Sequence, residues 1–80
     1  MRTPNYDIVE ITDELIVIAD LGPWDCFPTV TNAAEEVVKR LAPILRGRRL
    51  EYYDSEGERS QLLVKDGKFA GFAPAKMYDL

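Results

Sequence analysis

Histidine is absent from this chain of 80 residues, and cysteine and tryptophan occur only once each. Without histidine the chain lacks the commonest general base, the commonest zinc ligand and every catalytic triad that needs an imidazole. One cysteine cannot form an internal disulfide, which fits a reducing compartment, so we expect a cytoplasmic protein. We expect no catalytic residues, no metal and no cofactor, and we favour a protein that is not an enzyme.

Long apolar runs are also missing. No stretch approaches the ~20 consecutive apolar residues that span a bilayer, so we expect no membrane segment. The first seven residues lack the apolar core of a secretion signal. The glycines do not have the spacing of a phosphate-binding loop, and the acidic residues do not have the dense spacing of a calcium loop.

The composition is otherwise that of a folded domain, with 46% hydrophobic and 30% charged residues. Residues 1–38 carry eight acids and one base, net −7, whereas residues 39–80 carry nine bases and six acids, net +3. A chain of this size buries roughly 60–65% of its unfolded surface, so its core is thin. We expect one small globular domain over residues 1–80, with residues 1–5 and 75–80 as loose ends.

The last third of the chain contains two turn signals. Residues 54–57, Asp-Ser-Glu-Gly, predict a type I turn, and Asp66-Gly67 predicts a two-residue type I′ hairpin. These turns delimit strands at about 48–53, 59–65 and 68–73. The turns pair Leu50 with Leu62, Val64 with Phe69 and Leu63 with Ala70. Both registers place one apolar set on the same face of the sheet: Leu50, Tyr52, Leu62, Val64 and Phe69.

The other face of these three strands is mostly polar but keeps three large apolar or aromatic side chains. We assign to it Arg49, Glu51, Tyr53, Gln61, Leu63 and Phe72. Aromatic side chains surrounded by polar residues are typical of protein contact surfaces. Our candidates for a partner surface are therefore Arg49, Tyr53, Leu63 and Phe72. The alternative is a scatter of ordinary surface hydrophobes.

The first part of the chain predicts two strands, at 7–11 and 15–20, joined by a turn at Asp13-Glu14. Pairing Thr12 with Leu15 puts four branched residues on one face of this hairpin: Val9, Ile11, Ile16 and Ile18. The other face then carries Ile8, Glu10, Val17 and Ala19. Because the turn lacks the glycine that short hairpins favour, a single bent strand or a longer loop is the alternative.

One amphipathic helix is predicted over about residues 32–45. Asn32 followed by Glu35 has the form of a capping box, with Thr31 as the alternative cap. Apolar residues recur at three- and four-residue spacing up to Leu45, and Pro43 is expected to end or kink the helix. The element order ββαβββ predicts an α+β fold of two layers, with the helix packed on an antiparallel sheet.

The stretch between the second strand and the helix contains the only tryptophan and the only cysteine. As a binding loop it would use Asp20, Trp24, Asp25, Cys26 and Phe27. We favour the alternative, a crossover whose aromatic side chains fill the end of the core beside Ile18, Val37 and Leu41.

Three function classes follow from these features. The leading hypothesis is a non-enzymatic protein-interaction module that binds another protein or a second copy of itself as a homodimer. The first alternative is a small-molecule-binding or weakly catalytic domain that uses the Trp24 loop. The second is nucleic-acid binding through Arg46, Arg48 and Arg49, which the acidic isoelectric point near 4.7 disfavours.

Overall fold

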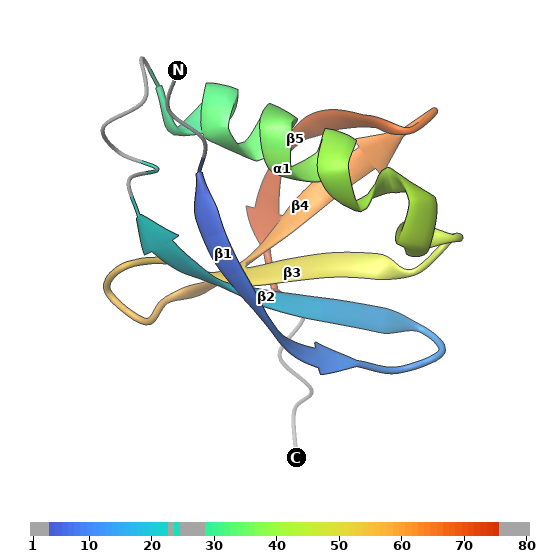
Figure 1. Cartoon of the computed structure of the whole chain (residues 1–80), viewed down its shortest axis with the longest axis horizontal. Coiled ribbons are helices and arrows are strands. Elements are labelled where there is room, and N and C mark those ends of the chain that lie inside the picture. Colours follow the sequence, from blue (N-terminus) through green and yellow to red (C-terminus); the bar gives the residue numbers. More distant parts are fainter. Residues whose placement is uncertain (1–3, 23, 25–28, 76–80) are drawn as a thin grey trace.

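The computed structural model describes residues 4–22, 24 and 29–75 of the chain (Figure 1). One helix, α1, lies in the sequence between the second and third of five strands. The bounds are Asn5–Ile11 for β1, Leu15–Gly22 for β2, Val30–Leu45 for α1, Arg49–Tyr53 for β3, Arg59–Lys65 for β4 and Lys68–Pro74 for β5. The predicted order ββαβββ is confirmed.

The five strands form one sheet in the order β1-β2-β3-β4-β5. Short turns join three of the neighbouring pairs, which are therefore antiparallel. The pair β2–β3 is parallel, because α1 returns the chain to the end of the sheet from which β2 started. The predicted α+β class is confirmed, and the sheet is mostly antiparallel with one parallel pair.

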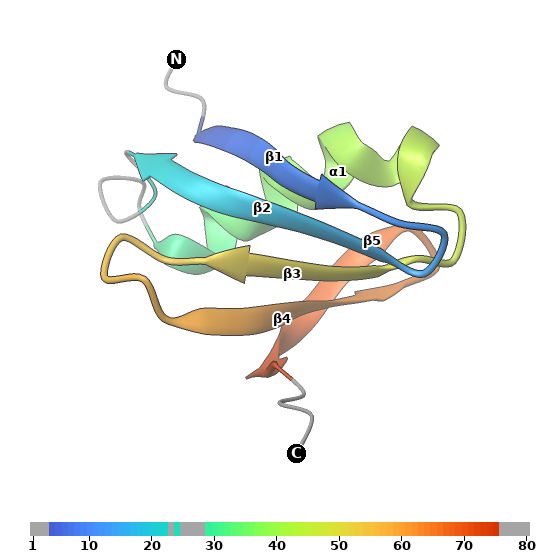
Figure 2. The same cartoon turned by 90° about the horizontal axis from the view of Figure 1, so that it is seen from below.

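The helix covers one face of the sheet and lies closest to β4 and β5. Seen from below, strands β1 to β4 lie in front of it, and no helix of the described residues lies on this face (Figure 2). We call the covered side the helix-side face, which carries Ile18, Tyr52 and Leu62, and the other side the helix-free face, which carries Val17 and Glu51. Within the described part of the chain, no helix is both long and apolar enough to cross a membrane.

Helix α1 begins earlier than the sequence predicted. Thr29 is the N-cap, and its hydroxyl accepts a hydrogen bond from the amide of Asn32 at 3.1 Å. Asn32 is thus a donor in the first turn and not the cap, so that prediction and the alternative cap at Thr31 are wrong. Pro43 does not end the helix, which continues to Leu45 and stops at Arg46 in the left-handed conformation (φ 47°).

The core lies between α1 and the helix-side face, and Trp24 is part of it. The indole is fully buried in the same cluster as Ile18, Val37 and Leu41, as predicted. Its ring stacks on Tyr52 with centroids 5.1 Å apart and planes 5° from parallel. A thin core gains much from one large aromatic side chain, and here that side chain comes from the crossover.

A β-bulge in β5 changes the face on which Phe72 lies. Val64 pairs with Phe69 as predicted, but Leu63 pairs with Gly71, so the predicted pairing of Leu63 with Ala70 is wrong. Gly71 has a φ of 139°, a conformation that a residue with a Cβ rarely adopts. The extra residue brings Phe72 opposite Leu62 on the helix-side face.

Candidate functional site

The predicted Trp24 loop is only partly described by the structure. The indole Nε1 donates to the Asn5 carbonyl at 2.8 Å, so the ring and its one polar atom are both engaged inside the protein. Asp20 is half-buried and accepts a hydrogen bond from the Gly22 amide at 2.6 Å. Asp25, Cys26 and Phe27 lie outside the described residues. A binding site in this loop therefore stays a prediction, and Trp24 itself has no exposed surface to offer a ligand.

The helix-free face carries a network of charges centred on Glu51. This side chain is only 1% exposed, and its two oxygens accept hydrogen bonds from Arg49 Nε at 2.7 Å and from Arg59 Nε at 2.6 Å. Arg59 also donates to the Tyr53 hydroxyl at 3.2 Å, and its guanidinium lies 5.3 Å from the centroid of that ring. Because Glu51 and Arg59 belong to β3 and β4, the network joins these two strands.

The electrostatics of this network favour the charged form of Arg59. Burial lowers the pKa of Arg59, but the adjacent Glu51 carboxylate and the Tyr53 hydroxyl outweigh it, and the pKa lies above its ordinary value. The two guanidinium groups and the buried carboxylate satisfy one another's charge and hydrogen-bonding groups, as in structural ion clusters. The sequence placed Glu51 on the face of the predicted surface but gave no sign that this side chain is buried.

The four predicted partner-surface residues do not form one surface. Arg49 and Tyr53 belong to the Glu51 network, and Leu63 is on the same face with 36% of its surface exposed. Phe72 is on the helix-side face, where its ring centroid lies 6.0 Å from that of Tyr52. Its placement with Leu63 was wrong because alternation along β5 is shifted by the bulge.

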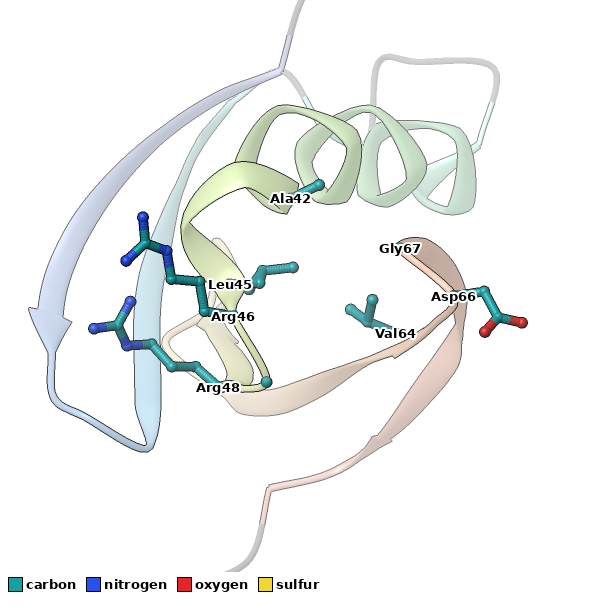
Figure 3. A pocket seen from close by; sticks show the side chains of 8 residues that line it. Ala42, Leu45, Arg46, Arg48, Val64, Asp66 and Gly67 are labelled. Atoms are coloured by element: carbon teal, nitrogen blue, oxygen red, sulfur yellow. The ribbon is translucent and has the colours of Figure 1, made fainter.

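A cleft of about 320 Å³ lies between the end of α1 and the β4–β5 hairpin (Figure 3). Leu45 and Val64 line it, whereas the charged ends of Arg46, Arg48 and Asp66 point away from its centre (Figure 3). The lining is about equally polar and apolar, but the charged groups that could orient a small ligand point outward.

Two arginines of the basic cluster beside this cleft, Arg48 and Arg49, make hydrogen bonds or ion pairs within the protein. Arg48 donates to the Thr12 carbonyl at 2.8 Å and to the Ile44 carbonyl at 2.7 Å, and Arg49 is paired with Glu51. Since these arginines hold the fold together, nucleic-acid binding through them stays a prediction that the geometry does not favour.

The β1 edge, which is the outer side of strand Asn5–Ile11, carries several exposed apolar side chains. Strand β1 stands at one end of the strand order, and of its residues only Tyr6 is half-buried while the rest are exposed. Val9 and Ile11 are each 51% exposed and Ile8 is 37% exposed. Isolated surface hydrophobes are ordinary, but here three residues of one edge strand are exposed aliphatics.

The backbone of an edge strand presents unpaired hydrogen-bonding groups. The amide of Thr12 donates to the Leu15 carbonyl at 2.8 Å, which makes this a hydrogen-bonded pair of the β1–β2 hairpin. Because such pairs alternate along an antiparallel ladder, the N–H and C=O of Ile11 point away from β2. Among the described residues no strand pairs with this side of β1. It is therefore a template for one more strand.

A bulge at Val9 determines which side chains of β1 share a face of the sheet. Ile8 pairs with Ile18 and Glu10 pairs with Val17, so Val9 is the extra residue. Ile8 and Ile11 consequently lie on the helix-side face, and Asp7 and Glu10 on the helix-free face. The prediction that put Val9 opposite Ile18, and Ile8 with Glu10, is wrong, because unbroken alternation does not allow for the extra residue.

No family model, curated protein or solved structure matches this chain. The function therefore has to be inferred from the chain's own residues.

Proposed function

We propose that this protein is a non-enzymatic interaction module that binds an extended segment of another protein beside β1, as an additional strand of its sheet. The observation that carries the proposal is the β1 edge, where exposed Ile8, Val9 and Ile11 accompany backbone groups directed away from β2. In this mode of recognition main-chain hydrogen bonds supply affinity, and alternate side chains supply specificity.

The remainder of the fold supports a rigid presentation of that edge. Strand β1 pairs with β2, whose Ile16 and Ile18 are fully buried in the core, and Trp24 fixes its first residue through the Asn5 carbonyl. An edge that is already ordered does not have to be ordered on binding, which lowers the entropic cost of association. We retain the cytoplasm as the proposed location, because one cysteine forms no internal disulfide.

The test uses selection from a displayed library of random peptides of about ten residues, followed by binding to three proteins: the unaltered chain, Ile11→Pro and Ile11→Thr. Proline removes the outward N–H of residue 11 and is tolerated at an edge, whereas threonine keeps that N–H and sheds similar apolar surface. We expect Ile11→Thr to retain binding of most selected peptides and Ile11→Pro to lose it.

Two results would contradict this proposal. One is selected peptides that bind Ile11→Pro as tightly as the unaltered chain, since they would not need the backbone of β1. The other is a homodimer that forms through β1 at micromolar concentration and excludes the peptides, which light scattering of the free chain detects. Circular dichroism of both variants confirms that the fold is kept.

A further inference from the structure

We infer that the segment bound by β1 alternates basic and aliphatic residues, with the basic side chains beside Asp7 and Glu10 and the aliphatic side chains beside Ile8 and Ile11. This inference rests on the proposed function and specifies the partner. Its basis is the bulge at Val9, which puts Asp7 and Glu10 on one face of β1 and Ile8 and Ile11 on the other.

The acidic face sets the charge of the partner. Asp7 and Glu10 are exposed, and they lie opposite Ala19 and Val17 of β2, so neither faces a basic residue across that ladder. Side chains directly opposite one another in neighbouring strands interact, and opposite charges stabilise the pair while like charges destabilise it. A strand with lysine or arginine at alternate positions meets both carboxylates on the helix-free face.

The aliphatic face sets the other half of the pattern. Helix α1 lies closest to β5 and β4, which stand at the other end of the strand order from β1. Ile8 and Ile11 therefore point to the helix-side face beyond the cover of the helix, and they remain 37% and 51% exposed. Alternate aliphatic side chains of an added strand would fall beside them and remove apolar surface from water.

The same charges disfavour a second copy of this chain as the partner. Two β1 strands brought together would place Asp7 and Glu10 near their own copies, in a chain of net charge −4. The turn that follows β1 adds two exposed acids, Asp13 and Glu14. Arg48 lies near this turn, where it donates a hydrogen bond to the Thr12 carbonyl. A basic segment of another protein complements this edge.

The experiment compares three synthetic peptides of about eight residues, which alternate valine with lysine, with serine or with glutamate, by fluorescence anisotropy on the full chain. We expect the valine–lysine peptide to bind about tenfold more tightly than the valine–serine peptide, a difference equivalent to about 1.4 kcal/mol, and the valine–glutamate peptide to bind most weakly. Added salt should reduce the preference for the valine–lysine peptide over the valine–serine peptide.

A pair of double variants assigns the preference to residues. Asp7→Asn with Glu10→Gln removes the two carboxylates of β1, and Glu56→Gln with Glu58→Gln removes two exposed carboxylates from the β3–β4 turn. We expect the β1 variant to lose most of the lysine preference and the turn variant to keep it. An equal loss in both variants would overturn the inference, because net charge alone would then explain it.

Two different results distinguish a wrong charge pattern from a wrong proposed function. If the valine–serine peptide binds as tightly as the valine–lysine peptide and both lose binding in Ile11→Pro, strand addition stands and the charge pattern is wrong. If binding of the valine–lysine peptide is unchanged in Ile11→Pro, the proposed function itself is wrong, and the inference falls with it.

Discussion

The two edges of the sheet are built differently. The β5 edge ends in Pro74, contains a bulge with Gly71 in an unusual conformation, and lies next to α1. The β1 edge also contains a bulge, at Val9, but it has no proline from Asn5 to Ile11, and its aliphatic side chains are exposed. Proline and cover by other elements are among the ways in which natural sheets close their edges, and of the two edges only β5 has them. The fold therefore closes one edge and leaves the other able to pair.

A row of aromatic rings explains how the β5 edge is held. Trp24 stacks on Tyr52, Tyr52 lies 6.0 Å from Phe72, and Phe72 meets Phe69 edge to face at 5.0 Å between centroids. The row runs from the crossover before α1 to β5. Strand β1 is connected to this row by the hydrogen bond from Trp24 to the Asn5 carbonyl, and its Tyr6 packs against the core.

The largest expected effect comes from breaking this row. We expect Trp24→Ala to lower the free energy of unfolding by about 3–5 kcal/mol, because it removes a fully buried ring and leaves Tyr52 without its stacking partner. Urea denaturation followed by circular dichroism measures the change. A loss below about 1 kcal/mol would show that the indole is not a core residue in solution.

A second change weakens the side-chain network that joins β3 to β4. Glu51→Gln replaces the buried carboxylate that both arginines hold, and we expect a loss of about 1–3 kcal/mol in the free energy of unfolding. Glu56→Gln, at an exposed position of the β3–β4 turn, serves as the control and should stay within about 0.5 kcal/mol. Equal stabilities of the two variants would contradict a structural role for the network.

Matched truncations compare the two edges directly. Phe72 and Ile11 are 38% and 51% exposed, yet only Phe72 contacts other rings. We expect Phe72→Ala to cost about 1–3 kcal/mol of unfolding free energy, and Ile11→Ala at most about 1 kcal/mol. Chemical denaturation of both variants gives the comparison. A larger cost at Ile11 would mean that the β1 edge is packed in the free protein.

The smallest expected effect is on alkaline stability. Burial, followed by the carboxylates of Asp54 and Asp20, raises the pKa of Tyr52 above its ordinary value of 10.0. The unfolded chain therefore releases this proton at lower pH than the folded chain, so stability from Tyr52 is complete below pH 10 and falls as pH rises further. The unfolding free energy of the unaltered chain should fall relative to that of Tyr52→Phe between pH 9 and pH 11. A constant difference across this range would contradict the shift.

The sequence predicts the parts of the fold that depend on local signals. The turns at Asp54 and Asp66 fix the pairings of Leu50 with Leu62 and of Val64 with Phe69, and both are observed. The bulges at Val9 and Ala70 could not be predicted in this way. Each depends on packing between distant segments, as when Phe72 turns toward Tyr52.

The candidate site was missed for the same reason. A regular hairpin puts Val9 and Ile11 on the core face, so the sequence gives no sign of an exposed aliphatic edge with its acids sorted to one side. The parallel pairing of β2 and β3, which leaves β1 at the end of the sheet, also follows from the route of α1 and not from any single turn.

Amide hydrogen exchange with the valine–lysine peptide bound tests the central claim most directly, because it reports on each edge of the sheet separately. We predict that the amide of Ile11 and the other outward amides of β1 gain protection when the peptide is added, while the amides of β5 and of the α1 cleft keep the exchange rates of the free protein. Protection gained at β5 or beside the cleft, with none at β1, would contradict strand addition at the β1 edge.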